Sequence, residues 1–323
     1  MSGFSIRLLG MLADGNFHSG QELADEFKVS RTTIWEGVRR LEALGVPIFS
    51  VRGHGYALVE SIELLDLNKV RIALPDNYSY DLRIVDCLES TNITLASMAG
   101  DLEKGTAIAA EIQTAGRGRL GRVWLAAPGL SLTFSMLWRF ESGIAALGGL
   151  SLAVGLACAT ALRELGCMNI NLKWPNDLVC GNEKLGGILI ETHGDLQGPI
   201  DAIIGIGINI NVPEAWSKAL GRKIANIYTS GTRPDRNRIL ATLLAKLTST
   251  LEEFEKNGFI GMKEAWRKMH IHENCLVSLS RDGKALIAGR ARGVSDEGAL
   301  LVETNAGVVE VVSGDISLVG EEV

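Results

Sequence analysis

The first 65 residues combine two helical patterns of apolar residues with a short segment of period two. Ser19 and Glu22 form a capping box that opens the first helix. Ser30 opens a second helix. The apolar stripe of this second helix is Ile34, Val38 and Leu41. Residues 48–51 and 56–59, joined by a glycine-containing turn, have the pattern of a β-hairpin.

Two helices, a three-residue turn and a hairpin are the parts of a winged helix-turn-helix, which we expect within residues 1–65. The outward face of the second helix would then enter the major groove of DNA. Its candidate DNA contacts are Ser30, Arg31, Thr32, Thr33, Trp35, Arg39 and Arg40. A plain helical hairpin with a solvated face has the same pattern and is the alternative.

The charge of this unit limits how it could bind DNA. Residues 1–65 carry six Lys or Arg and eight Asp or Glu, so their net charge is −2. Because affinity for DNA depends largely on neutralising phosphates, one such copy would bind weakly. We therefore expect DNA binding to need two copies, each on one half-site.

Strands and helices alternate from residue 66 to about residue 270, after a connector over 60–68. Strands are expected over 82–85, 106–111 and 130–138, and around Leu172, Ile188 and Ile208. Helices are expected over 91–99, 143–162, 238–257 and 259–268. Residues 130–138 alternate apolar and polar side chains, which is typical of a half-buried strand. The pattern predicts a mixed α/β domain over 66–270.

The end of the chain has a different pattern. From Cys275 onward only short strands and glycine-containing turns are expected. This pattern predicts a small β-barrel over residues 271–323. The fold class is therefore α+β with three domains, which suits a length of 323 residues.

Composition narrows the classes of function. A net charge of −6 excludes a protein that coats nucleic acid by bulk charge. Five cysteines without CxxC spacing favour reduced thiols in a cytoplasmic protein over a disulfide framework or a zinc site. The first ten residues are too polar for a signal peptide. Residues 143–162 are uncharged, but ten of them are Gly or Ala, so we expect a buried helix and no membrane span.

The most unusual segment is the loop GRGRLGR at residues 116–122, with three glycines, three arginines and no acid. Glycines let a backbone close around a ligand, and arginines donate forked hydrogen bonds to carboxylates and phosphates. The loop therefore suits one anionic ligand, or two anions brought together. It matches neither a GxGxxG dinucleotide turn nor a P-loop. A flexible basic loop is the alternative.

Three further segments place polar residues or glycines at strand ends and at a helix start. Residues 173–178 (KWPNDL) and Lys184 could assemble a polar site, and Gly186-Gly187 and residues 205–211 (GIGININ) mark close approach of the backbone. Residues 90–92 (STN) open a helix, where free amides and hydroxyls can hold a polar group. The alternatives are a solvated turn lysine, tight helix–sheet packing and a simple helix cap.

Taken in order, these segments resemble the family of bifunctional biotin–protein ligases and biotin operon repressors. The matches are STN at 90–92, GRGRLGR at 116–122, KWPND at 173–177, KLGGILIE at 184–191 and GIGIN at 205–209. The resemblance covers nearly the whole chain and implies a winged-helix start and an SH3-like β-barrel end. It implies that biotin and ATP, with Mg²⁺, form biotinyl-5′-AMP. The biotinyl group would then pass to one lysine of the biotin carboxyl carrier protein of acetyl-CoA carboxylase.

The resemblance also implies roles for single residues. Lys184 and Arg119 would act in catalysis, and Asp177 would orient the acceptor lysine or a metal. Biotin would be bound by Ser90, Thr91, Asn92, Gln113, Arg117, Gly118, Arg119 and Lys184. The nucleotide would be bound by Arg122, Asn176 and Asn209. No dedicated side-chain cluster for a metal is expected.

One position departs from the family pattern. Ile224 stands where members often cover the adenine with a tryptophan, and Tyr228 is the candidate substitute. The resemblance implies a homodimer when biotinyl-AMP is bound, which would repress biotin synthesis genes at operator DNA. One alternative is a ligase whose N-terminal domain binds no operator. A sensor without catalysis is the other, and it would not need Lys184 together with three loop arginines.

Overall fold

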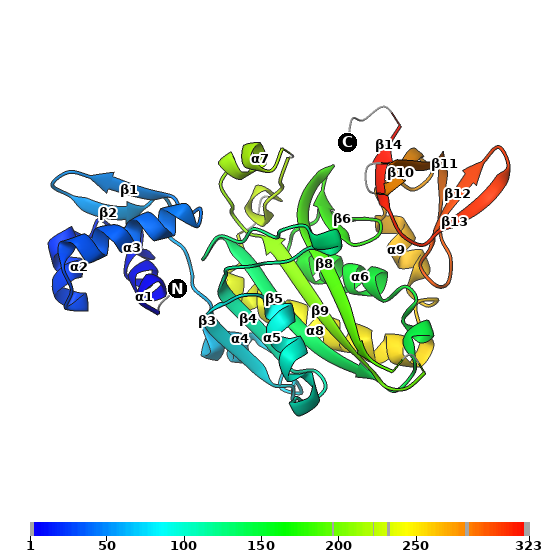
Figure 1. Ribbon diagram of the computed structural model, residues 1–323, viewed down its shortest axis with the longest axis horizontal. Helices are drawn as coiled ribbons and strands as arrows, with labels where there is room; N and C mark the ends of the chain where they lie inside the picture. Colours follow the sequence, from blue (N-terminus) through cyan, green and yellow to red (C-terminus); the bar gives the residue numbers. More distant parts are fainter. Residues whose placement is uncertain (1–2, 196, 222, 231–232, 282–283, 320–323) are drawn as a thin grey trace.

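Figure 1 shows the computed structural model of the chain, with a helical unit at one end, a broad sheet in the middle and a smaller sheet at the other end. The structure describes residues 3–195, 197–221, 223–230, 233–281 and 284–319. The N-terminal unit is a winged helix-turn-helix built from α1 (Gly3–Leu12), α2 (Gly20–Phe27), α3 (Arg31–Ala43), β1 (Ile48–Val51) and β2 (Gly55–Leu58). The expected capping box at Ser19 and the cap at Ser30 are confirmed.

A seven-stranded mixed sheet forms the centre, in the order β3-β4-β5-β9-β8-β7-β6. Its strands are β3 (Leu82–Leu88), β4 (Ala107–Gln113), β5 (Ser131–Phe140), β6 (Ile170–Lys173), β7 (Asp177–Cys180), β8 (Glu183–Gly194) and β9 (Ile200–Asn209). The helices of this part are α4 (Leu67–Ala73), α5 (Thr91–Met98), α6 (Leu150–Glu164), α7 (Ala215–Ala219), α8 (Arg236–Asn257) and α9 (Lys263–Met269). The pattern predicted neither β7 nor the helices α1, α4 and α7, and it placed the start of α9 too early.

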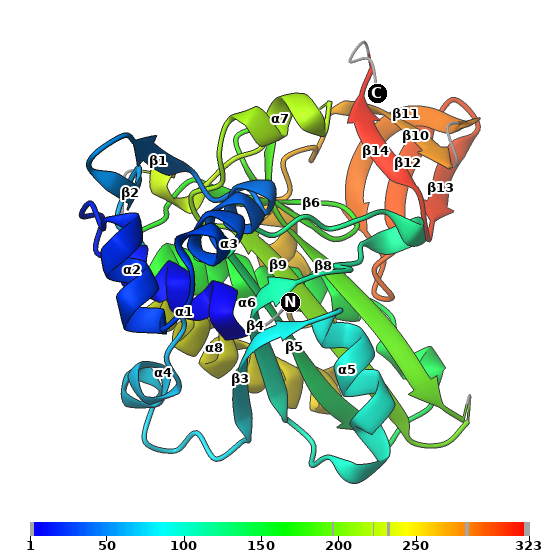
Figure 2. The ribbon, with the colours of Figure 1, turned by 60° about the vertical axis from the view of Figure 1, so that its left-hand side comes forward.

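Helices cover both faces of the central sheet. Figure 2 shows α5 on one face of the sheet. There Leu95 of α5 packs in a cluster with Leu137 of β5. On the other face, Phe134 of β5 belongs to the large core shared with α6 and α8. The expected strand over 130–138 is confirmed, but it is not half-buried, because nine of the ten residues of β5 are buried. Polar Ser135 of this strand faces α5 and not solvent.

The apolar segment 143–162 contains a buried helix, as expected, but the helix starts later. Gly149 has a left-handed φ of 78°, so α6 begins only at Leu150. Ten residues of α6 are buried. Within the described chain, residues 144–164 are the one segment long and apolar enough to cross a membrane, and half of its most apolar window is buried inside the protein.

A five-stranded antiparallel sheet forms the C-terminal part, in the order β13-β12-β11-β10-β14. Its strands are β10 (Leu276–Arg281), β11 (Lys284–Val294), β12 (Leu300–Thr304), β13 (Gly307–Val311) and β14 (Asp315–Leu318). Among the described residues no hydrogen bonds join β13 to β14, so the sheet is open and a closed SH3-like barrel is not confirmed. Val277 and Leu279 belong to the same core as the central sheet.

The winged helix has a separate core but touches the central part where α3 ends. Leu8, Leu23 and Ile34 are fully buried within it. Gly45, just after α3, has a φ of 87°, and a side chain there would overlap the ring of Trp216 in α7. Glycine is thus required at this position both by the backbone and by the neighbouring ring.

The segment that leaves the winged helix ends in a helix cap. The side chain of Asp66 accepts hydrogen bonds from the amides of Asn68 and Lys69, which starts α4. The expected connector over 60–68 is therefore two residues too long. The amide of Asp66 in turn donates to the side chain of Asn237 at the start of α8.

A buried ion pair fixes the same segment to the central sheet. Arg236 of α8 and Glu111 of β4 are 1% and 3% exposed, with Nη1 2.9 Å from Oε1. Arg236 also donates to the carbonyls of Glu63 and Ser131, and Glu111 accepts from the amide of Leu65. Replacing one partner would leave the other charged and buried, which is strongly destabilising.

We predict that Glu111→Gln lowers the free energy of unfolding by about 3–5 kcal/mol, because it keeps the shape but leaves the Arg236 charge uncompensated. Urea unfolding measures this loss. Arg233→Met is the control, because Arg233 pairs with Glu60 at the surface and should matter by less than about 1 kcal/mol. Equal losses in the two variants would contradict the assignment.

Two histidines are buried where α9 meets the C-terminal sheet. His270 stacks on Trp266 with ring centroids 4.6 Å apart, and His272 lies 5.7 Å from His270. Neither ring nitrogen of His270 has a hydrogen-bond partner among the described residues. Burial lowers the pKa of His270 to about 3 and the pKa of His272 to about 4. The positive charge of Lys173 contributes to both pKa shifts in the same direction. Both rings are neutral in the folded protein at neutral pH.

These lowered pKa values predict destabilisation by acid. In the unfolded chain a histidine has a pKa of about 6.5, so below that pH the unfolded chain binds protons that the folded chain does not. The free energy of unfolding should be largest above about pH 6.5. Below that pH it should fall by up to about 1.4 kcal/mol per pH unit for each histidine. His270→Phe keeps the stacked ring and should flatten this slope in urea unfolding between pH 7.5 and 5. An unchanged slope would contradict the prediction.

Candidate active site

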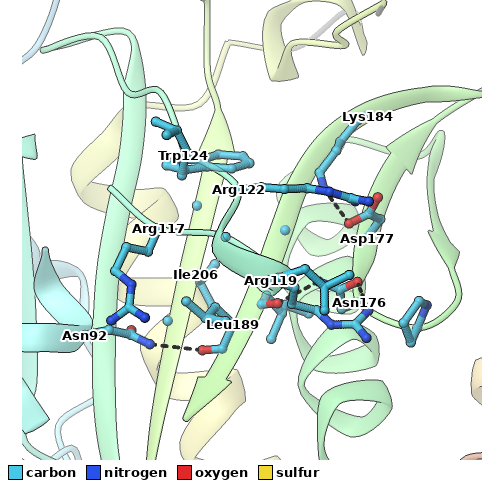
Figure 3. A pocket seen from close by; sticks show the side chains of 18 of the residues that line it. Asn92, Arg117, Arg119, Arg122, Trp124, Asn176, Asp177, Lys184, Leu189 and Ile206 are labelled. Carbon is cyan, nitrogen blue, oxygen red and sulfur yellow. Dashed lines mark hydrogen bonds and ion pairs between the residues drawn. The ribbon is translucent and has the colours of Figure 1, made fainter. Parts of the chain in front are cut away.

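A cavity of about 450 Å³ opens between the central sheet, the glycine-arginine loop and the first residues of β14. Figure 3 shows Asn92 and Arg117 at one end of it and Lys184, Asp177 and Asn176 at the other. Of the predicted catalytic, biotin and nucleotide residues, the following line it: Ser90, Thr91, Asn92, Gln113, Arg117, Gly118, Arg119, Arg122, Asn176, Asp177 and Lys184. The structure therefore brings together four segments that are far apart in the sequence.

Glycines in β9 make room for this cavity. A side chain at Gly205 would collide with the amide of Asn92, and one at Gly207 would collide with the indole ring of Trp124. The indole therefore lies flat against the strand and forms a wall of the cavity. Its Nε1 is buried and has no hydrogen-bond partner among the described residues.

The end of the cavity at the start of α5 is a hydrogen-bonded polar cluster. Ser90 occupies the cap position of α5, but its side chain makes no capping bond, so the simple cap reading is wrong. Gln113 Oε1 takes that role by accepting from the amide of Thr91 at 2.8 Å. Ser135 Oγ lies 2.6 Å from both Thr91 Oγ1 and Asn92 Oδ1. The buried hydroxyl of Ser90 is thus available to a ligand.

Asn92 also connects this end of the cavity to a carboxylate. Its Nδ2 donates to Glu191 Oε2 at 2.8 Å and to the carbonyl of Leu189 at 3.3 Å. Glu191 Oε1 lies 3.3 Å from Nη2 of Arg117. The first arginine of the loop is therefore paired with a side chain from β8.

Two more cations of the cavity, Lys184 and Arg122, are paired with carboxylates. Lys184 Nζ lies 2.5 Å from Asp177 Oδ1. Arg122 forms two hydrogen bonds with Asp315 of β14, at 2.5 and 3.2 Å, and these bonds lower the pKa of the Asp315 carboxyl. Arg119 instead donates to the amide oxygen of Asn176 at 3.0 Å, and burial lowers its pKa. Arg119 thus faces the cavity without a direct carboxylate partner in the described chain.

The loop itself is a tight hairpin. Gly118 N donates to the carbonyl of Arg122 at 2.7 Å, and Trp124 N donates to that of Gly116 at 2.9 Å. Leu120, at its tip, has a φ of 56°, a conformation that residues with a side chain rarely adopt. Such strained positions concentrate at ligand-binding sites.

Two expected nucleotide positions lie elsewhere. Asn209 lines a small neighbouring cavity of about 20 Å³ and donates to the carbonyl of Lys184 at 3.4 Å. Ile224 borders the same small cavity, together with Trp216 of α7. Tyr228 lines neither cavity and stacks under Arg233 instead.

Three residues at or next to the cavity were not singled out from the sequence. Glu191 and Ser135 contact Asn92 of the lining, and both had a signal, because Glu191 lies inside the quoted KLGGILIE segment and Ser135 is a polar residue in an apolar strand. Asp315 had none, because it reaches the cavity from the far end of the chain. Among the described residues no group of three His, Cys, Asp or Glu could hold a metal ion.

The candidate DNA contacts lie at the other end of the molecule, on α3 (Figure 1). Ser30, Arg31, Thr32, Trp35, Arg39 and Arg40 are exposed, and Thr33 is half-buried. Arg39 and Arg40 form ion pairs with Glu42 and Glu36 of the same helix.

Known proteins share this architecture. Family profiles match at residues 5–57 (HTH domain), 84–211 (Biotin/lipoate A/B protein ligase family) and 270–319 (Biotin protein ligase C terminal domain). The bifunctional ligase/repressor BirA of Salmonella typhimurium is 37% identical over 97% of both chains, and that of Bacillus subtilis is 30% identical over 95% of both. Biotin protein ligase from Aquifex aeolicus in complex with biotin and ATP is 32% identical, with a TM-score of 0.63 over 74% of this chain and 98% of its own. The chain therefore belongs to the BirA family of bifunctional ligase/repressors.

Proposed function

We propose that the protein joins biotin to a carrier protein in two steps at this cavity. A carboxylate oxygen of biotin attacks the α-phosphorus of ATP, the bond to the β-phosphate oxygen breaks, and pyrophosphate leaves. The ε-amine of a lysine on the biotin carboxyl carrier protein then attacks the carbonyl of biotinyl-5′-AMP. An amide forms, AMP leaves, and the amine loses a proton.

The observation that carries this proposal is the set of cations facing one cavity. The first step brings a carboxylate to a phosphate, so two anions must be held together against their repulsion. Lys184, Arg119 and Arg122 can supply that charge where it develops. Lys184 and Arg122 can exchange Asp177 and Asp315 for ligand oxygens.

The polar cluster at the start of α5 suits the biotin head group. Ser90, Thr91, Asn92 and Gln113 supply hydroxyl and amide groups there, and Gly118 leaves space for the ligand, with Arg117 and Arg119 nearby. The expected roles of these residues in biotin binding are part of the proposal, as is the catalytic role of Arg119 and Lys184.

The nucleotide would lie toward Arg122 and Asn176, on the side of the cavity next to Lys184. Asn209 would act through the backbone of Lys184. Because Trp216 and Ile224 border the small cavity beside Lys184, we propose that Trp216, and not Tyr228, closes the adenine side.

Magnesium would enter with ATP, because its role is to neutralise phosphate charge. Asp177 is the carboxylate of the lining best placed to hold it, since its partner Lys184 would turn to the ligand. The same carboxylate could orient the acceptor lysine in the second step.

We further propose that the protein, working in the cytoplasm, represses biotin synthesis genes when biotinyl-AMP is bound. Residues 1–65 would bind operator DNA and residues 66–270 would form the catalytic domain. Residues 271–323 would close the site as an SH3-like barrel. Leu120 of the glycine-arginine loop and Val123 and Leu125 just after it are exposed, and this apolar edge suits a homodimer contact. The exposed face of α3 favours this reading over a ligase whose winged helix binds no operator.

We predict that Lys184→Ala lowers the rate of pyrophosphate release by about 100-fold or more, while biotin binding weakens less. The lysine would mainly stabilise the negative charge that develops in the transition state, and this affects the rate more than the binding of biotin. Pyrophosphate release and equilibrium biotin binding measure the two effects. Lys218→Ala, on the exposed side of α7, is the control. Release at the wild-type rate in Lys184→Ala would overturn the assigned role.

We also predict that biotin with ATP promotes both dimerisation and DNA binding, because a single copy with net charge −2 binds phosphates weakly. The ligands would order the loop, and two α3 helices would meet major grooves about 34 Å apart or a multiple of that. Sedimentation and gel shifts on the upstream DNA of the biotin synthesis genes measure this. Added carrier protein should reverse it. Equal operator affinity without ligands would rule out the coupling, and no affinity in either state would favour the ligase-only alternative.

A further inference from the structure

Trp35 is exposed on the winged helix and takes no part in the core of that domain. All six tryptophans lie in the described part of the chain, and Trp35 alone among them is exposed, with 53% of its surface open to solvent. The core of the winged helix is complete without it. Because aromatic side chains gain most from burial, an outward tryptophan points to a surface that covers it in a complex.

The position of Trp35 is the one that faces DNA in a winged helix. It lies four residues after Arg31 and four before Arg39, so the three side chains form one stripe along α3. Trp35 also borders a groove between α3 and the hairpin, with Arg31 and Thr32 on one side and residues 50–53 on the other. The first turns of a recognition helix are the part that contacts base edges.

The charges on this face leave few side chains free to read bases. Arg39 Nη1 lies 3.0 Å from a Glu42 oxygen, and Arg40 Nη2 lies 3.7 Å from a Glu36 oxygen. Arg31 has no carboxylate partner among the described residues. Arg31 and Trp35 are therefore the large side chains of the first two turns that are available to bases.

The chemistry of an indole ring selects its target. In the major groove, thymine alone presents a methyl group, and proteins read it through apolar contact. We propose that Trp35 recognises a thymine by packing against its methyl group in each half-site of the operator. This inference rests on the proposed repressor function and adds the base that the helix prefers.

Replacing thymine by uracil tests this contact, because uracil keeps every hydrogen-bonding group and loses only the methyl. The full-length protein with biotin and ATP first selects tight duplexes from a random pool. The best duplex is then made with thymine or with uracil, and its affinity is measured by gel shift. We expect uracil to weaken binding by about 15-fold, since one buried methyl is lost in each of two half-sites, about 1.6 kcal/mol together.

Two variants show which residue reads the methyl. Trp35→Ala should bind the thymine duplex more weakly and should not distinguish it from the uracil duplex. Phe49→Ala is the matched control, because Phe49 is 50% exposed on β1 of the same domain and should keep the thymine preference. Thermal unfolding of each variant confirms that the domain is folded.

Each contrary result has a distinct meaning. Equal wild-type affinity for the thymine and uracil duplexes would overturn methyl recognition. A thymine preference that persists in Trp35→Ala would overturn the assignment to this residue. If no duplex from the pool is bound with biotin and ATP present, the repressor function itself fails, and the inference fails with it.

Discussion

The ion pair between Arg236 and Glu111 is the constraint on which the arrangement of the chain depends. It lies inside the central part, yet it binds the backbone of Glu63 and Leu65, which lead out of the winged helix. A buried pair adds little stability by itself, but it tolerates few alternative arrangements of the groups around it. Here it specifies one path for the segment between the two units. Together with the contact of Gly45 and Trp216, it holds the winged helix in one position against the central part.

The same logic of paired charges governs the cavity. Lys184, Arg117 and Arg122 each lie beside a carboxylate from another segment, so the charges of these three cations are compensated in the cavity without ligand. Cations that face one another would otherwise repel and spread the loop and the strands apart. An anionic ligand then replaces a carboxylate and need not strip water from a bare cation. Part of the binding selectivity can come from this exchange, because a neutral molecule cannot compete for the arginines.

The sequence was informative where residue types break a pattern and uninformative where distant segments meet. Glycine and arginine at 116–122, and asparagine at helix and strand ends, located most of the cavity lining. Asp315 could not be found, since its partner Arg122 is 193 positions away in the chain. The alternation in β5 was real, but periodicity cannot tell a polar face turned to water from one turned to α5 and the cavity. The short strand β7 was missed because four residues carry too weak a pattern.

The contact between Gly45 and Trp216 also bears on how this protein can be dissected. Trp216 is covered on one side by the end of α3, and Gly129 is covered by Ile62 of the connecting segment. A ligase cut free of its winged helix would expose both surfaces to water, and Trp216 borders the small cavity next to Lys184. Its tendency to aggregate would then rise even though every residue of the cavity remained. A minimal enzyme built from this scaffold would need a polar side chain in place of Trp216, or a substitute cap over α7.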